Sequence, residues 1–98
     1  MCDTQGVIYK GREKGMNKWK EEFATEQSYR TLKEALVGAH VFIGVSSGNL
    51  LNAEDVAKMA PKPIIFAMAN PIPEISVAEA RKGHPDAIIA TGRSDYPN

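Results

Sequence analysis

The sequence predicts an α/β fold made of parallel βαβ units, and two kinds of observation carry that prediction. Short apolar runs lie at residues 41–45, 64–67 and 87–90, and each stops at a polar or turn residue. Runs without polar alternation are typical of strands that are buried on both faces, as in a parallel sheet covered by helices. Helix-start signals lie between the runs, at residues 52–55 and 76–79. This alternation predicts right-handed βαβ crossovers.

The N-terminal part carries weaker signals. Residues 1–3 are interpreted as the end of a strand, and Gln5-Gly6 as a turn before a β-prone run at residues 7–9. A charged, glycine-containing loop is expected next, and Asn17 is placed to cap a helix that runs to Ala24. Basic and acidic residues are interleaved here, which is typical of a solvated face. The basic residues of that face are Lys10, Arg12, Lys14, Lys18 and Lys20.

Capping patterns predict three further helices. A Thr-x-x-Glu box begins at Thr31 and a Ser-x-x-Glu box at Ser76, while Asn52 precedes two acidic residues. Gly38 is the expected C-cap of the first of these helices, and Pro61 marks the end of the second. The buried stripe of the first helix is predicted to consist of Leu32, Ala35 and Leu36.

Composition argues against several classes of protein. The 98 residues contain 12 basic and 12 acidic side chains, so no charge excess favours nucleic acid or an anionic membrane as a partner. The zero net charge also gives little electrostatic resistance to self-association. No apolar run approaches the roughly eighteen residues of a membrane span, and no signal peptide is recognised. With Cys2 as the single cysteine, a cytoplasmic location is expected.

Candidate site residues lie at predicted strand ends, because ligands of parallel α/β sheets bind beyond the carboxyl ends of the strands. Asp3 is a candidate acceptor for an adenosine ribose, or else a turn-starting aspartate. The segment Ser46–Asn49 either exposes backbone groups to a ligand or forms an ordinary loop. Asn70 is the strongest candidate, since its amide both donates and accepts and Pro71 restricts its backbone. The alternative for Asn70 is a turn-forming role alone.

Other chemistry-bearing patterns are missing or misplaced. The sequence contains no glycine-rich phosphate motif, no His-Glu-x-x-His and no Cys-x-x-Cys. His40 and His84 precede predicted strands, at the edge opposite to an α/β active site, so structural or solvent roles are expected for both.

Several segments resemble the NAD(P)-binding domain of bacterial-type malic enzymes, and together they cover essentially the whole chain. These segments are Asp3–Glu13, Met16–Lys20, Arg30–Leu32, Val41–Ser46, Ala67–Pro71 and Ala90–Asn98. The resemblance implies a Rossmann-like domain over residues 1–98 that is truncated at both ends. It implies that Asp3 binds the ribose, that Val45 and Ser46 line the dinucleotide, and that Asn70 meets nicotinamide and malate.

The same resemblance implies a parent enzyme that oxidises malate with NAD or NADP and decarboxylates the product to pyruvate. Mg or Mn would assist, with the metal ligands, the acid and the base all upstream of Met1. No catalytic residue is therefore assigned here, and the chain alone is expected to be inactive. The alternative is a non-catalytic α/β binding or interaction module. Because a central strand is expected to be missing, residues 41–45 should form an exposed edge that favours self-association and leaves cofactor binding weak.

Overall fold

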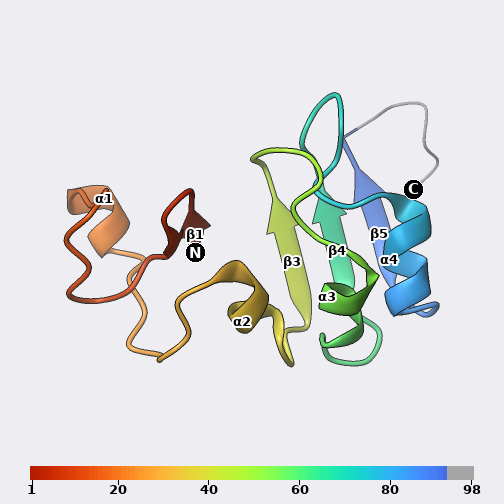
Figure 1. Cartoon of the computed structure of the whole chain (residues 1–98), viewed down its shortest axis with the longest axis horizontal. Helices are drawn as coiled ribbons and strands as arrows, with labels where there is room; N and C mark the ends of the chain where they lie inside the picture. Colours follow the sequence, from red (N-terminus) through yellow and green to blue (C-terminus); the bar gives the residue numbers. More distant parts are fainter. Residues whose placement is uncertain (93–98) are drawn as a thin grey trace. The chain divides into compact units, whose positions relative to one another are not determined.

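The computed structural model describes residues 1–92 (Figure 1). The chain forms two compact units. The first unit comprises residues 1–35 and the second begins at Leu36. The segment 93–98, which carries most of the last motif of the resemblance, lies outside the described residues.

The first unit contains a small antiparallel ribbon. β1 (Cys2–Asp3) pairs with β2 (Gly6–Val7), and the turn between them lies at Thr4 and Gln5. The predicted strand end at residues 1–3 is therefore a strand, while the turn comes one residue earlier than expected. Gly6 has a φ of 98° and lies against the carbonyl of Arg30, where a Cβ would clash. A glycine is needed at this position for both reasons.

The predicted helix after Asn17 is present but short. α1 (Lys18–Glu21) begins where the Asn17 side chain accepts hydrogen bonds from the amides of Trp19 and Lys20. The expected continuation to Ala24 is wrong. The amides of residues 23 and 24 bond to carbonyls three residues back, and this tighter turn ends the helix.

The Thr31 capping box is confirmed in full. The amide of Glu34 donates to Thr31 Oγ1 at 3.2 Å, and the amide of Thr31 donates to Glu34 Oε1 at 3.1 Å. These bonds open α2 (Leu32–Leu36), which ends before Gly38 with its φ of 74°. Of the predicted buried stripe, Leu36 is buried, whereas the two other members are only partly covered.

The second unit is built on a three-stranded parallel sheet. β3 (Val41–Gly44), β4 (Ile64–Ala67) and β5 (Ile88–Thr91) lie in the order β3-β4-β5, as Figure 1 shows. The register aligns the first residues of the three strands. The predicted parallel sheet is confirmed. β4 covers the predicted residues, β3 ends one residue earlier than predicted, and β5 begins and ends one residue later.

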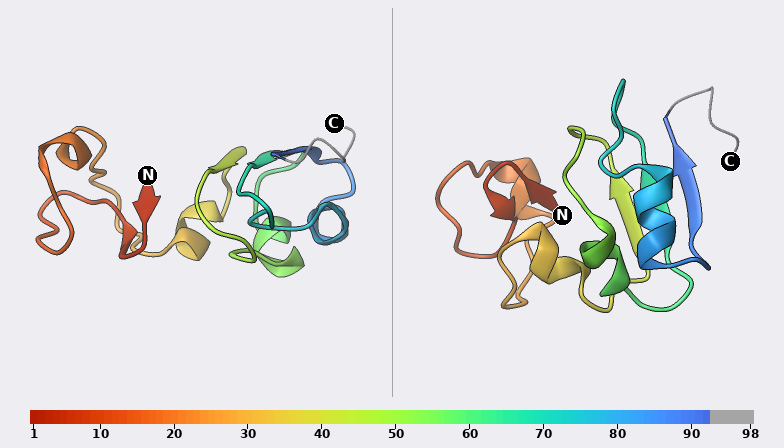
Figure 2. Two further views of the ribbon diagram at one scale, coloured as in Figure 1. Left: turned by 90° about the horizontal axis from the view of Figure 1, so that it is seen from above. Right: turned by 45° about the vertical axis from the view of Figure 1, so that its right-hand side comes forward.

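Two helices cover one face of this sheet (Figure 2). α3 (Ala53–Ala57) begins at an Asn52 capping box, and α4 (Val77–Gly83) begins at Ser76, whose hydroxyl accepts from the Glu79 amide. The Glu79 side chain was expected to accept from the amide of Ser76, as the second bond of the capping box. Glu79 instead accepts from the amide of Ala53 at 3.3 Å, because the two helices lie side by side.

The expected burial of the strands on both faces is wrong for this chain. Side chains alternate along β3, so that Phe42 faces the helices while Val41 and Ile43 remain 47% and 60% exposed. Ile88 on β5 is also exposed, whereas Ile89 is buried. The core therefore lies between the sheet and the helices α3 and α4, and the opposite face keeps an apolar surface.

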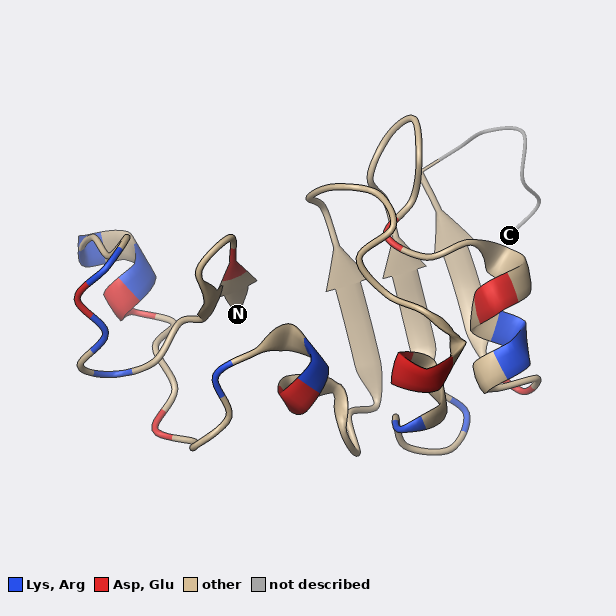
Figure 3. Ribbon diagram, viewed as in Figure 1, with Lys and Arg blue, Asp and Glu red and all other residues tan. Residues whose placement is uncertain are grey.

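Within the second unit, charged side chains lie only on the described helices and loops (Figure 3). None of the strands β3, β4 and β5 contains a charged residue. No helix within residues 1–92 combines the length and the apolar character that a bilayer crossing needs.

Candidate functional site

Three segments follow the carboxyl ends of the parallel strands and meet at one edge of the sheet (Figure 1). They are residues 45–52 after β3, residues 68–76 after β4, and residues 91–92 at the end of β5. Gly48 approaches Ile72 so closely that a Cβ would lie 2.7 Å from the Ile72 side chain. A Cβ at Gly92 would lie 2.6 Å from the carbonyl oxygen of Met68. Glycine thus permits close contact between neighbouring segments.

A buried carboxylate joins the first two segments. Glu74 has no exposed surface, and its Oε2 accepts from the amide of Ser46 at 3.0 Å. Its Oε1 accepts from the amide of Ala69 at 3.1 Å. Burial of a charge without partners is strongly unfavourable, so these two bonds compensate for the lost hydration.

The backbone of the same residue extends this connection. The carbonyl of Glu74 accepts from the amides of Leu50 and Leu51 at 2.7 and 3.0 Å. The carbonyl of Pro73 accepts from the amide of Asn49 at 3.0 Å. The segment after β3 is therefore held along much of its length by residues 73–74.

The last residue of β3 leaves room for the buried carboxylate. A Cβ at Gly44 would clash with the Glu74 carboxylate and would lie 2.8 Å from Cζ of Phe42. A glycine inside a strand often marks such a close approach. This need for space explains why β3 ends in a glycine.

The predicted site residues of this unit are exposed around that carboxylate. Val45 is 76% exposed, and the side chains of Ser46 and Asn70 are also accessible. The Asn70 amide donates to the carbonyl of Gly92 at 3.4 Å, a long bond that restrains it weakly. The structure thus brings the Ser46 and Asn70 segments together and leaves their polar side chains available to a ligand.

Asp3 belongs to the first unit, where it accepts from several donors. Arg12 donates from Nη1 to Oδ1 at 2.9 Å and from Nη2 to Oδ2 at 2.6 Å. Lys20 Nζ donates to Oδ2 at 2.8 Å, and the amide of Gln5 to Oδ1 at 2.9 Å. The hydrogen bonds from Arg12, followed by that from Lys20, hold the pKa of Asp3 well below its usual range.

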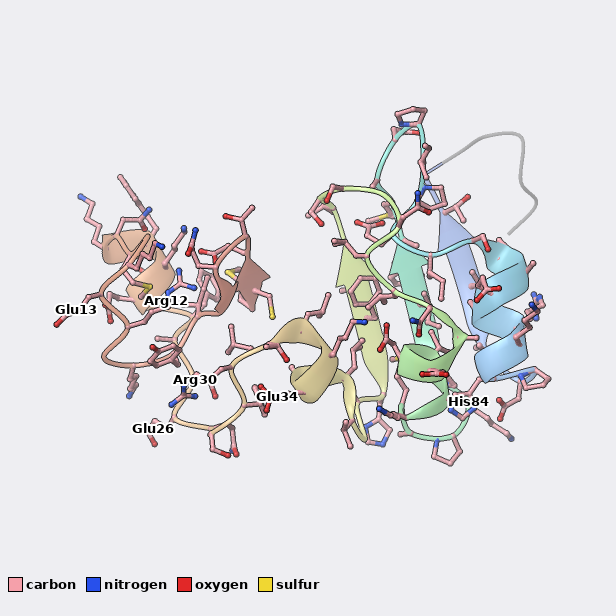
Figure 4. All side chains as sticks on the ribbon, in the orientation of Figure 1. Arg12, Glu13, Glu26, Arg30, Glu34 and His84 are labelled. Atoms are coloured by element: carbon pink, nitrogen blue, oxygen red, sulfur yellow. The ribbon has the colours of Figure 1, made fainter. Side chains whose placement is uncertain are left out.

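Assigning Arg12 to a solvated face was therefore wrong. Its side chain is only 4% exposed, and the forked pair with Asp3 compensates for the burial (Figure 4). A further bond from Nη1 reaches the carbonyl of Val7 at 3.2 Å. Within the described residues, Nε of Arg12 is buried without a hydrogen-bond partner.

The burial of two charged residues, Glu74 and Arg12, was not predicted from the sequence. Both are buried charges; Glu74 binds the Ser46 amide 28 residues away, and Arg12 binds Asp3 nine residues away. The available signal for Glu74 was a lone charge between Pro73 and Ile75, directly after the Asn70 turn.

The histidines make contacts of a structural kind. His84 Nε2 lies 3.1 Å from the carbonyl of Met59, and His84 Nδ1 lies 3.3 Å from Asp86 (Figure 4). The carbonyl of His40 accepts from the amide of Ile64 at the amino end of β4. Within residues 1–92, no cluster of three or more His, Cys, Asp or Glu residues is arranged to hold a metal ion.

A parallel βαβ sheet with polar segments gathered at its carboxyl edge is typical of α/β domains that bind ligands at that edge. Residues 1–95 match the family model "Malic enzyme, NAD binding domain". The chain belongs to the malic enzyme family and corresponds to a segment of its NAD-binding domain.

Individual relatives agree with this assignment. The chain is 59% identical over 98 residues to the NADP-dependent malic enzyme of Rhizobium meliloti (strain 1021), covering 100% of this chain and 13% of that protein. It is 50% identical to the NAD-dependent malic enzyme of the same organism, over 98% of this chain and 12% of that protein. The crystal structure of the NAD-dependent malic enzyme from Thermotoga maritima matches 95% of this chain and 26% of that one, with 43% identity and a TM-score of 0.83.

The ion pair of Asp3 predicts a pH-dependent stability. Because the folded-state pKa of Asp3 is depressed, its stabilising effect is present above the unfolded value of about 3.9 and is lost as the pH falls through the lower folded value. Asp3→Asn should therefore lower the midpoint of thermal unfolding at neutral pH, and the difference from the wild type should shrink below about pH 4. Circular dichroism melts of both proteins across this pH range measure it.

Glu26→Gln is the matched control, because Glu26 pairs with Lys10 at 2.9 Å on an exposed surface. Exposed pairs contribute little, so its melting curve should stay close to that of the wild type. If Asp3→Asn changes the midpoint equally at every pH, the ion pair is not the source of the effect.

Proposed function

We propose that this chain forms part of the NAD(P)-binding wall of a malic enzyme and that Asn70 also faces the substrate. The observation that supports this most directly is the convergence of the Ser46 and Asn70 segments at the carboxyl edge of β3 and β4. Because the chain spans only 13% of the Rhizobium NADP-dependent relative, oxidation of malate and its decarboxylation to pyruvate are proposed for the whole protein. A cytoplasmic location stays a prediction.

The side chains at this edge suit a dinucleotide and a small hydroxy acid. Val45 offers an exposed apolar surface to a ring, and the hydroxyl of Ser46 can donate to or accept from a polar ligand group. The Asn70 amide can bond a carboxamide and a carboxylate at once, since it has both donors and an acceptor. The nicotinamide cofactor, NAD or NADP, would accept the hydride, while these residues bind and orient it.

Asp3 is proposed to accept a hydrogen bond from the adenosine ribose. Its side chain is 20% exposed, and Lys20, the more exposed of its two basic partners, is 31% exposed. A ribose hydroxyl can therefore reach Oδ2 by displacing Lys20 while the buried Arg12 keeps the carboxylate in place. In the whole enzyme, Mg or Mn would find its ligands mainly outside this chain, and within residues 1–92 no group of three or more His, Cys, Asp or Glu residues is arranged to hold a metal ion.

The proposal predicts a kinetic effect at Asn70. We suggest replacing the matching segment of the Rhizobium NADP-dependent enzyme with this chain to obtain a full-length chimera. Asn70→Ala in that chimera should weaken transition-state stabilisation by about 2 kcal/mol, because buried polar groups of the ligands lose their partner. Steady-state kinetics with malate and NADP as varied substrates measure the change.

The control is Glu26→Gln, which changes an exposed carboxylate that pairs with Lys10 outside the proposed site. It should leave the kinetic constants near those of the unmodified chimera. Unchanged constants for both substrates in Asn70→Ala would leave Asn70 with a turn-forming role alone.

Self-association through the edge strand β3 also stays a prediction. Val41 and Ile43 are exposed on this strand, and an apolar edge tends to pair with a second chain. Sedimentation velocity of the 98-residue chain should show an apparent mass that rises with concentration. A single monomeric species at every concentration, with NADP binding in the micromolar range, would refute the prediction.

A further inference from the structure

We propose that Glu74 is a positioning residue that fixes Ser46 and Asn70 relative to each other at the cofactor edge. This inference rests on the proposed function and assigns a role to a residue that contacts neither ligand itself. It acts through the backbone amides that it binds.

The Glu74 carboxylate accepts hydrogen bonds from two amides that belong to the proposed site or lie next to it. One oxygen binds the amide of Ser46, a proposed cofactor contact, at 3.0 Å. The other binds the amide of Ala69, the residue directly before Asn70, at 3.1 Å. A movement of either segment would break a charge-assisted bond in a buried site, which is unfavourable. The carboxylate therefore couples two segments that belong to different strands.

The Glu74 side chain is closely surrounded. Its exposed fraction is 0%, and its carboxylate lies against the Cα of Gly44, where even a methyl group would clash. Its own carbonyl is bonded to the amides of Leu50 and Leu51. Both the side chain and the backbone of Glu74 are thus fixed, as a positioning role requires.

Glu74→Gln in the chimera tests this role with little change in volume. A glutamine keeps one acceptor oxygen, but its NH₂ group cannot accept a hydrogen bond, so one of the two amides loses its partner. We expect the dissociation constant for NADP, measured by calorimetry, to rise about tenfold, and kcat/KM for malate to fall by a similar factor.

Glu79→Gln serves as the matched control. Glu79 also accepts from a backbone amide, that of Ala53 at 3.3 Å, but this bond connects α4 to α3 and not the two site segments. It should change stability without changing the NADP dissociation constant. An equal loss of NADP affinity in Glu79→Gln would mean that the effect is general destabilisation, and would overturn the proposal.

A double-mutant cycle separates positioning from mere structural support. If Glu74 acts by placing Asn70, Asn70→Ala should reduce kcat/KM by a markedly smaller factor in the Glu74→Gln background than in the unmodified chimera. Independent, multiplying factors would overturn the proposal. If Glu74→Gln does not fold, Gly44→Ala, which crowds the carboxylate without removing it, should show the same loss of NADP affinity, and wild-type affinity there would also overturn it.

The outcomes also distinguish this inference from the proposed function. An unmodified chimera that folds but binds no NADP contradicts the proposed function. A chimera that binds NADP and oxidises malate normally, and is unaffected by Glu74→Gln, contradicts only the role of Glu74.

Discussion

One buried carboxylate, that of Glu74, determines how the candidate site is assembled. Neighbouring parallel strands end at the same edge of a sheet, but the hydrogen bonds of the sheet do not fix the positions of the loops that follow. Here the amides of Ser46 and Ala69 converge on the two oxygens of Glu74. Removing this charge from water is unfavourable unless hydrogen bonds replace the hydration. The native arrangement satisfies the carboxylate only when both segments are in place, so burial and site geometry depend on each other.

Three glycines of the second unit permit close approaches at the same edge of the sheet. Gly44 leaves space for the carboxylate, Gly48 allows contact with Ile72, and Gly92 allows contact with Met68. Each glycine lies where a strand or its following segment approaches a neighbour. The edge is therefore tightly packed in its backbone, while Val45 and Asn70 remain exposed above it. A rigid support with accessible polar groups suits the binding of an extended cofactor.

The sequence predicted those parts of the fold that depend on local signals. The strand at residues 64–67 and the helix starts at Asn17, Thr31 and Asn52 were correct, because apolar runs and side-chain caps act over a few residues. The Ser76 box was correct only in part, since Glu79 found a partner on another helix. The exposed face of the sheet was not predicted. An apolar run does not indicate whether helices of this chain cover one face of the strand or both.

The site was predictable only to the level of its exposed residues. Asn70 and Ser46 were found because strand ends in parallel sheets are general ligand sites. The burial of Glu74 and of Arg12 could not be predicted, since a charged residue in a loop is most often solvated. Both depend on partners that only the folded chain brings near, the Arg12 partner Asp3 being nine residues away.

Native-state hydrogen exchange of the 98-residue chain tests the central claim most directly. The amides of Ser46 and Ala69 lie outside the strands, yet both are bonded to one buried carboxylate. We expect both amides to be protected and to exchange with the same opening free energy, because one opening event releases both. An unprotected Ser46 amide beside a protected Ala69 amide would contradict the claim that Glu74 holds the two segments as one unit.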